Sequence, residues 1–172
     1  DFVVKIAPGA DFDALAQWGF DGEIEVTSWG GSVREACLWS GGLAQARRRA
    51  SVLDTGEHLV DSDPDDCDVS PVDRFLVDPD GAVVRAGLVR QYAARHGLSQ
   101  LDPQIAYLTG PALPTGTRGF EVIDSIKFSE KTLRQALSQL DCGPLEILVR
   151  GVRVEPDALR RRLKPRGSTP LT

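Results

Sequence analysis

The arginine and lysine residues of this sequence are the ones whose chemistry and spacing suggest a binding function. One group recurs along a predicted helix after Pro79, and a second group clusters in the last quarter of the chain. Guanidinium groups bind phosphates through paired hydrogen bonds, so both groups suggest contact with a nucleic-acid backbone. The alternative is a solvated helix face paired with nearby acids such as Glu155 and Asp157. The residues expected to contact nucleic acid are Arg85, Arg90, Arg150, Arg153, Arg160, Arg161, Arg162, Lys164 and Arg166.

The distribution of charge is uneven. The net charge is −5, yet ten acidic side chains face a single arginine between residues 51 and 80. From Phe120 to the end, ten Lys and Arg residues face seven Asp and Glu residues. The chain as a whole has a pI of about 5.0, whereas a dedicated nucleic-acid-binding domain has a pI above about 9. Charge alone therefore leaves nucleic-acid contact and a solvated surface both open.

Catalytic and metal-binding residues are not predicted. The two histidines are His58, near an acidic run, and His96, at a predicted helix C-terminus where the helix dipole favours a cation. The three cysteines form no CxxC pair and are expected to be reduced thiols in a cytoplasmic protein, with a single disulfide as the alternative. The acidic run 61–68 lacks the spacing of a calcium-binding loop and is interpreted as a solvated linker.

Cofactor-binding residues are not predicted either. A nucleotide or S-adenosylmethionine site on a doubly wound sheet needs a glycine-rich turn between the first strand and the first helix. The glycine pairs at 30–31 and 41–42 lack that context, and the chain has no P-loop sequence. Both pairs are interpreted as turns.

The elements that would position these residues fall into two groups, separated at the acidic run. The first group starts with an apolar strand at 2–6, of the kind buried on both faces in a parallel sheet, and a short helix from Asp11. The glycine pair at 30–31 predicts a hairpin, and a third antiparallel strand is expected to follow it. The predicted strands of the hairpin and the third strand are 23–29, 32–39 and 47–53.

The second group, from Val69, alternates helices and strands. One helix is predicted from Pro79 to Gly97 with Asp78 as its N-cap, another after the cap Ser129, and a third from Pro156. A loop is expected over 110–119, and no element is expected at the C-terminal end. The predicted strands are 105–109, 120–128 and 145–150.

The chain is expected to be part of a longer polypeptide. It contains no Met and opens at Asp1 directly into the apolar strand. Any catalytic machinery is then expected in the preceding part, and this chain is expected to be inert alone. No apolar run approaches the roughly 18 residues of a membrane-spanning helix, so no membrane contact is predicted.

Several strings of residues also resemble a known family. They resemble the THUMP-like domain that follows a class I S-adenosylmethionine-dependent methyltransferase domain in bacterial, largely actinobacterial, proteins. Residues 4–9 (VKIAPG) resemble a late strand of that methyltransferase sheet, and 57–61 (EHLVD) resemble the join between the two domains. The strings that resemble the THUMP-like domain are 81–89 (GAVVRAGLV), 101–109 (LDPQIAYLT), 119–122 (GFEV), 146–152 (EILVRGV) and 157–163 (DALRRRL).

The resemblance implies a mixed α/β fold. Residues 1–60 would be the strand-rich C-terminal tail of a doubly wound methyltransferase sheet, 61–68 the linker, and 69–172 a small α/β THUMP-like domain. S-adenosylmethionine is the cofactor implied for the parent protein, with no site for it in this fragment. The implied partners are the N-terminal methyltransferase half and RNA.

A structural or oligomerisation module without nucleic-acid binding is the alternative function. In that case Phe2, Val4 and Ile6 would form an exposed apolar sheet edge, which would favour association with a second copy.

Overall fold

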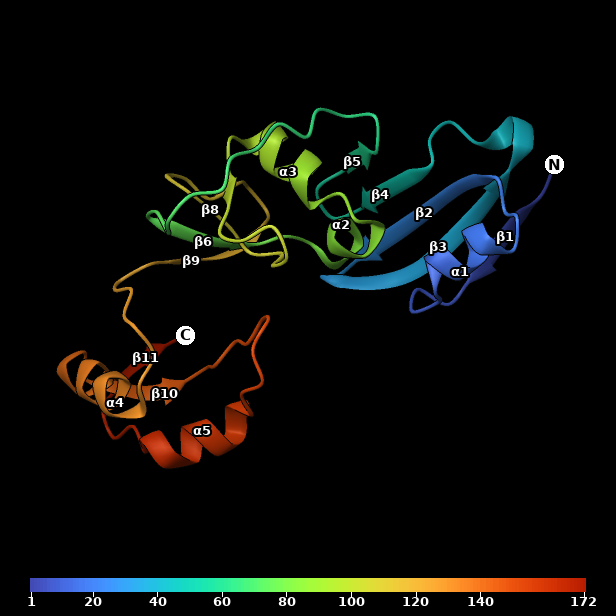
Figure 1. The fold of residues 1–172 in the computed structure, drawn as a ribbon. Helices are drawn as coiled ribbons and strands as arrows, with labels where there is room; N and C mark the ends of the chain where they lie inside the picture. Colours follow the sequence, from blue (N-terminus) through green and yellow to red (C-terminus); the bar gives the residue numbers. More distant parts are fainter. The chain divides into compact units, whose positions relative to one another are not determined.

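The computed structural model describes residues 1–172, which form two compact units, Asp1–Gly119 and Phe120–Thr172 (Figure 1). The mixed α/β class predicted from the sequence is confirmed: short helices alternate with strands of three sheets. None of the helices is both long and apolar enough to cross a membrane.

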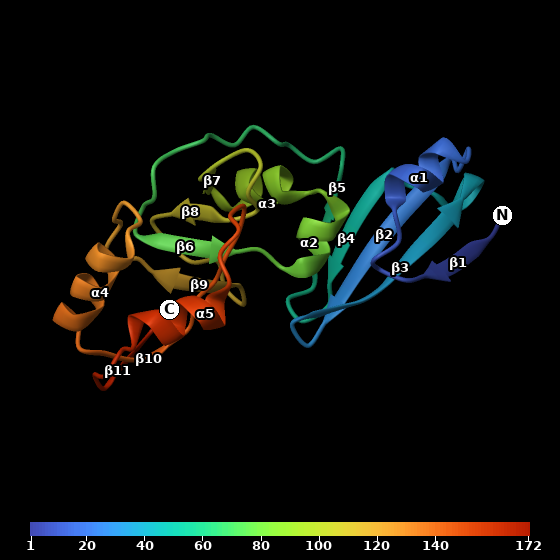
Figure 2. The ribbon, with the colours of Figure 1, turned by 60° about the horizontal axis from the view of Figure 1, so that its bottom comes forward.

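The first unit contains a five-stranded sheet with the order β1-β3-β2-β4-β5 (Figure 2). The predicted hairpin is confirmed, because β2 and β3 pair in antiparallel fashion around Gly30 and Gly31. Their φ angles of 62° and 67° are the left-handed values that a two-residue hairpin turn requires. The strands are β1 Val3–Ile6, β2 Gly22–Trp29, β3 Ser32–Ser40, β4 Arg48–Val52 and β5 Glu57–Val60.

Two strands of this sheet differ from the prediction. β1 is an antiparallel edge strand paired with β3 alone, so Val3 and Val4 are exposed rather than buried within a parallel sheet. β4 runs parallel to β2, not antiparallel to β3. Both edges of β3 are already occupied by β1 and β2, so the chain passes through a short 3₁₀ turn, η1 (Gly41–Leu43), and reaches the free edge of β2.

Three helices belong to the first unit. The short helix predicted from Asp11 is α1 (Phe12–Gln17), and the Asp11 side chain caps its N-terminus by accepting hydrogen bonds from the amides of Asp13 and Ala14. α2 (Gly81–Ala86) packs on β2 and β4. Residues beyond the acidic run therefore share one core with the first sheet. The boundary between the compact units accordingly lies at residue 119, not at the predicted linker 61–68.

The helix predicted from Pro79 to Gly97 is two helices. Gly87 adopts φ 78° and ends α2, and α3 (Val89–His96) follows and ends at Gly97 as expected. The N-cap is Asp80, whose carboxylate accepts a bond from the Ala82 amide. The predicted cap Asp78 instead ends a strand of a second sheet, ordered β7-β8-β6-β9. Its strands are β6 Phe75–Asp78, β7 Ser99–Gln100, β8 Leu108–Gly110 and β9 Arg118–Glu121.

The second unit consists of α4 (Glu130–Gln139), β10 (Cys142–Leu145), α5 (Pro156–Leu163) and β11 (Thr169–Leu171). The predicted cap Ser129 and the predicted helix start Pro156 are both confirmed. Residues 122–128 and 146–150 are not strands, contrary to expectation, and the C-terminal end forms β11. β11 pairs in parallel with β10, so its formation depends on a partner 27 residues away rather than on a local pattern.

Candidate nucleic-acid interface

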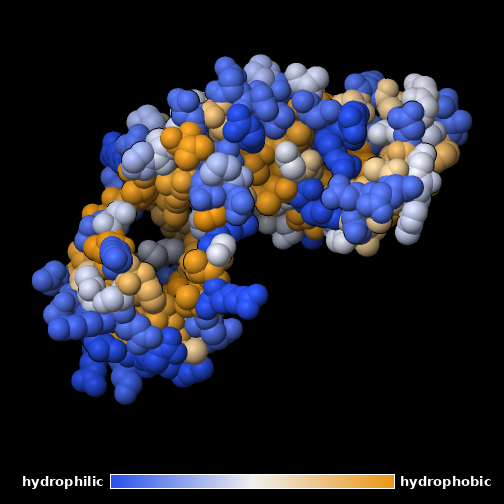
Figure 3. Space-filling model, viewed as in Figure 1, coloured by the Kyte–Doolittle hydropathy of each residue, from blue (hydrophilic) through white to orange (hydrophobic).

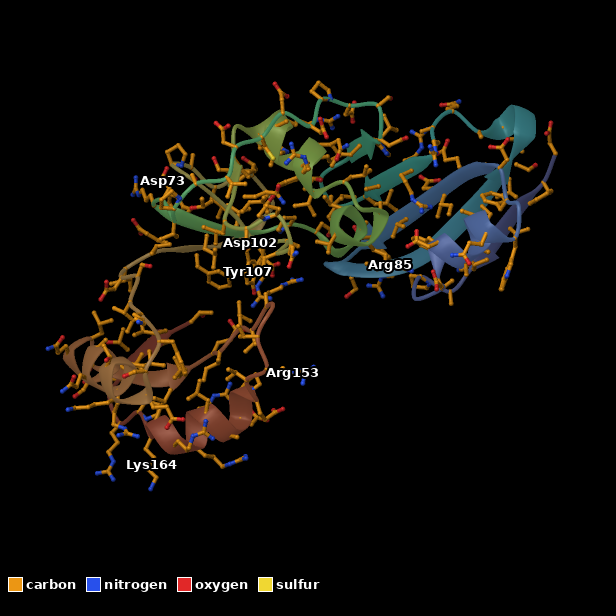
Figure 4. All side chains as sticks on the ribbon, in the orientation of Figure 1. Asp73, Arg85, Asp102, Tyr107, Arg153 and Lys164 are labelled. Carbon is orange, nitrogen blue, oxygen red and sulfur yellow. The ribbon has the colours of Figure 1, made fainter.

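Arg85, a predicted phosphate contact, is bound within the first unit (Figure 4). Its guanidinium donates hydrogen bonds to the carbonyl oxygens of Pro8, at 2.5 Å, and of Ala10. It also lies 3.8 Å from the ring centroid of Phe12, a cation–π contact. Arg85 therefore ties the loop before α1 to α2, and we leave it out of the interface.

Replacing Arg85 by Ala is expected to destabilise the first unit by about 2–3 kcal/mol, because two charge-assisted hydrogen bonds and a cation–π contact are lost. Urea unfolding followed by tryptophan fluorescence measures this, since all three Trp residues lie in the first unit. Affinity for RNA is expected to stay within about twofold of the wild type. A large loss of RNA affinity without destabilisation would return Arg85 to the interface.

Arg90 and Arg95 on α3 hold the acidic run. Arg90 donates to the carbonyl oxygen of Asp65 at 2.6 Å, and Arg95 donates to the Asp63 carboxylate at 2.8 Å. His96, at the predicted helix C-terminus, lies 2.7 Å from the Glu57 carboxylate. The run 61–68 is thus attached to α3 rather than a free linker, which local sequence alone could not show.

In the second unit, part of the predicted set is also engaged. Arg160 donates to the carbonyl oxygen of Leu145 at 2.7 Å and to Asp157 at 2.6 Å. Arg150, another predicted phosphate contact, also interacts with other groups of the protein. Four other predicted cations are exposed and form no ion pair within the chain, and hydrophilic side chains cover the outer surface of α5 (Figure 3). These four are Arg153, Arg161, Lys164 and Arg166.

A pocket of about 620 Å³ lies within the second unit. It is bounded by α4, the turn from α4 to β10, the end of α5 and residues 164–167. Four cations and one carboxylate line it, so its local charge is positive. These five residues are Arg134, Arg162, Lys164, Arg166 and Asp141.

Arg134 is the pocket cation that the sequence did not predict. Its guanidinium donates to the carbonyl oxygen of Arg162 at 3.0 Å, which joins α4 to α5 across 28 residues of sequence. The only signal in the sequence was a basic residue one turn before the apolar Leu137 of an amphipathic helix. A basic residue in that position is ordinarily solvated at the surface. The pocket depends on the packing of α4 against α5, which local sequence does not indicate.

Two residues of the pocket are held in states that disfavour covalent chemistry. The hydroxyl of Ser168 (2.6 Å) and its backbone N–H (3.2 Å) donate to Asp141 Oδ2, and these bonds lower the pKa of that carboxyl. Burial, and secondarily the charge of Asp141, raise the pKa of the Cys142 thiol, which keeps it protonated and weakly nucleophilic. The arrangement is suited to binding an anion rather than to attacking a substrate.

The backbone of the same pocket is strained. Asp141 (φ 52°) and Lys164 (φ 49°) are the only two non-glycine residues of the chain with positive φ, and both line the pocket. Such conformations cost stability and concentrate at functional sites. Lys164 ends α5 in this conformation, and its side chain extends away from the ribbon (Figure 4).

The glycine pairs do not fit a site for S-adenosylmethionine. Gly30 and Gly31 close the β2–β3 hairpin, and the Gly42 amide donates to Asp1 Oδ1 at 3.1 Å within η1. Neither pair forms the turn from a strand to a helix N-terminus at which such ligands bind in doubly wound sheets. We therefore derive no step through a methyl donor from these residues.

Comparison with known proteins relates the chain to methyltransferases. A family model described as THUMP domain-like matches residues 117–172. Two Mycobacterium tuberculosis proteins, of strains CDC 1551 and H37Rv, are named uncharacterized S-adenosylmethionine-dependent methyltransferases. Each is 65% identical to the chain over 173 residues, covering 99% of it. This chain spans 48% of those relatives, about half of their length.

A solved structure shares the fold. It comes from Porphyromonas gingivalis W83, is provisionally named a methyltransferase, and superposes with a TM-score of 0.71 at 21% sequence identity. The match covers 97% of this chain and 45% of that one. The α/β architecture, including its several sheets and few helices, is therefore that of a known structure.

Proposed function

We propose that this chain is the C-terminal half of an S-adenosylmethionine-dependent methyltransferase and that residues 120–172 help to bind its RNA substrate. The names of the two mycobacterial relatives and the THUMP-like match support the proposal. The observation that carries it is the contrast in charge. Residues 120–172 have a net charge of +3, with exposed cations on and beside α5, whereas residues 1–119 have a net charge of −8.

Binding would act on the phosphate backbone rather than on unpaired bases. The second unit contains no Trp or Tyr, and Phe120 and Phe128 are its only aromatic residues. Recognition of single-stranded bases usually depends on stacking against such rings. The proposed role is therefore to position a substrate by its backbone, while the methylated atom is selected elsewhere in the protein.

The affinity of the chain for RNA is expected to fall linearly with salt on a log–log scale, with a slope of about −0.7 for each single-strand phosphate contact. Replacing Arg153 and Arg161 by Ala should weaken binding and make that slope shallower by about one contact or more. Fluorescence anisotropy with a labelled single-stranded RNA and an RNA hairpin measures both quantities. Arg47→Ala, an exposed arginine of the first unit, is the matched control and should change neither.

The second candidate function is a structural module, favoured by the open edge of β1. Phe2, just before this strand, and Val3 and Val4 within it are 52%, 47% and 42% exposed, which is an unusual amount of apolar surface for a sheet edge. Ile6, the other residue expected at this edge, is instead half-buried against the core. Absence of RNA binding even at low salt, together with a dimer in sedimentation velocity, would replace the first candidate with this one.

A further inference from the structure

We propose that the pocket bounded by α4, α5 and residues 164–167 binds one ribonucleotide, with its phosphate held by Lys164 and Arg166. This inference rests on the proposed function, because RNA would be the source of that nucleotide. It assigns a particular site, whereas the proposed function requires only a basic surface.

Two of the pocket cations are preorganised. Arg134 donates one hydrogen bond to the Arg162 carbonyl oxygen, and Arg162 donates from Nε to Glu130 at 2.8 Å. A guanidinium has five N–H donors, so each of these side chains is oriented by one bond and retains several for a ligand. Side chains already fixed in place lose less entropy on binding.

Lys164 and Arg166 are exposed and have no carboxylate partner in the chain. The backbone that carries them is fixed, because the Gly167 amide donates to the Cys142 carbonyl oxygen at 2.7 Å and Ser168 binds Asp141. Glycine would adopt the φ of Lys164 without strain. A lysine at this position therefore costs stability relative to a glycine, and we take its charge to be the compensating property.

The side chains that line the pocket indicate the class of ligand. Guanidinium and ammonium groups together suit a phosphate, and a pocket of about 620 Å³ has room for a nucleotide beyond the phosphate group. Both hydrogen bonds from Ser168 reach Oδ2 of Asp141, which leaves Oδ1 to accept a further bond. A ribose 2′-hydroxyl is such a donor, and it distinguishes RNA from DNA. This contact with the ribose would explain why a mainly cationic pocket includes one carboxylate.

The test uses the whole chain and four variants. Lys164→Gly and Arg166→Ala remove the proposed phosphate contacts, and Lys127→Ala and Lys131→Ala, at exposed lysines of the same unit outside the pocket, are the matched controls. Lys164→Gly is expected to raise the melting temperature, because it relieves the positive φ, so a loss of binding by this variant cannot come from unfolding. The probes are adenosine 5′-monophosphate, its 2′-deoxy analogue, inorganic phosphate and a short single-stranded RNA.

The expected result is a saturable shift of the Gly167 and Ser168 amide resonances in NMR spectra with adenosine 5′-monophosphate. Affinity should fall about tenfold in Lys164→Gly and in Arg166→Ala, the factor that one charge-assisted contact typically provides, and stay within about twofold in the controls. The deoxy analogue should bind several-fold more weakly. Inorganic phosphate should shift the same amides at higher concentration.

The outcomes separate this inference from the proposed function. RNA binding that is insensitive to Lys164→Gly and Arg166→Ala would overturn the pocket and leave the proposed function standing. Binding of the mononucleotide without binding of RNA would support the pocket and remove RNA as the source of the nucleotide. If neither probe binds, both proposals fail, and equal affinity for the ribose and deoxyribose forms would overturn the role of Asp141.

Discussion

Replacing Glu23 by Gln should lower the free energy of unfolding of the first unit by about 3–5 kcal/mol, the typical cost of removing one partner of a buried ion pair. Glu23 is only 3% exposed. Its carboxylate accepts hydrogen bonds from the amides of Gln45 (2.8 Å) and Ala46 (3.0 Å) and pairs with Arg49. A glutamine can satisfy the amides or the guanidinium with its single oxygen, but its NH₂ group then faces another donor.

The same pair predicts how the loss depends on pH. Burial raises the pKa of Glu23, but the bonds from Arg49 and the two amides outweigh it, so the pKa in the folded state lies below its ordinary value. The stabilisation is therefore complete above the unfolded pKa of about 4.3 and is lost as pH falls through the folded pKa. The difference between wild type and Glu23→Gln should be largest near neutral pH and should shrink in acid.

Urea unfolding followed by tryptophan fluorescence at neutral and acidic pH measures this difference. Glu35→Gln is the matched control, because Glu35 lies on the neighbouring strand β3 and pairs with Lys5, whose side chain is 68% exposed. Exposed pairs contribute less than about 1 kcal/mol, so the control should be nearly neutral. Equal effects of the two substitutions would show that burial does not determine the strength of the Glu23 pair.

The sequence was most informative where structure depends on neighbouring residues. The glycine pair at 30–31, the cap at Ser129 and the proline at 156 each specify backbone geometry within a few residues, and each of these predictions is confirmed. The direction of β4 was predicted wrongly, because it depends on which edges of β3 are already occupied. That information lies in the pairing of β1, about 40 residues earlier in the chain.

The positive charge of the candidate site could be predicted from the sequence, but the partners of its side chains could not. Arg162, Lys164 and Arg166 were expected from their density near the C-terminal end, and they do line one pocket. No local pattern indicates that the Arg85 donors are used by carbonyl groups 75 and 77 residues away. A basic residue in a sequence indicates available charge, whereas its partners depend on tertiary packing.

The pocket also depends on a close approach of two backbone segments. A Cβ on Gly167 would overlap the carbonyl group of Asp141, and one on Gly143 would overlap the carbonyl group of Gly167. The obstacle in each case is backbone, which a change of side-chain rotamer cannot relieve. The two glycines therefore allow β10 and β11 to pair beside the pocket.

Replacing Gly167 by Ala is accordingly expected to cost about 3 kcal/mol or more, the upper range for inserting an atom into a packed site. Separation of the strands would break the bonds from the Gly167 amide to Cys142 and from the Thr169 amide to Asp141. The second unit has 53 residues and a small core, so this cost is a large share of its stability.

The loss should be confined to the second unit, which makes it measurable. Because every Trp lies in the first unit, tryptophan fluorescence should follow the wild-type unfolding curve in Gly167→Ala, while the NMR methyl signals of Leu159 and Leu163 lose their native dispersion. Gly9→Ala is the control, since a Cβ there meets nothing within 4 Å, and it should change stability by less than about 0.5 kcal/mol. Native methyl signals in Gly167→Ala would show that the backbone around residue 167 can move to accommodate a Cβ at little cost. The claim that a fixed backbone supports the pocket would then be wrong.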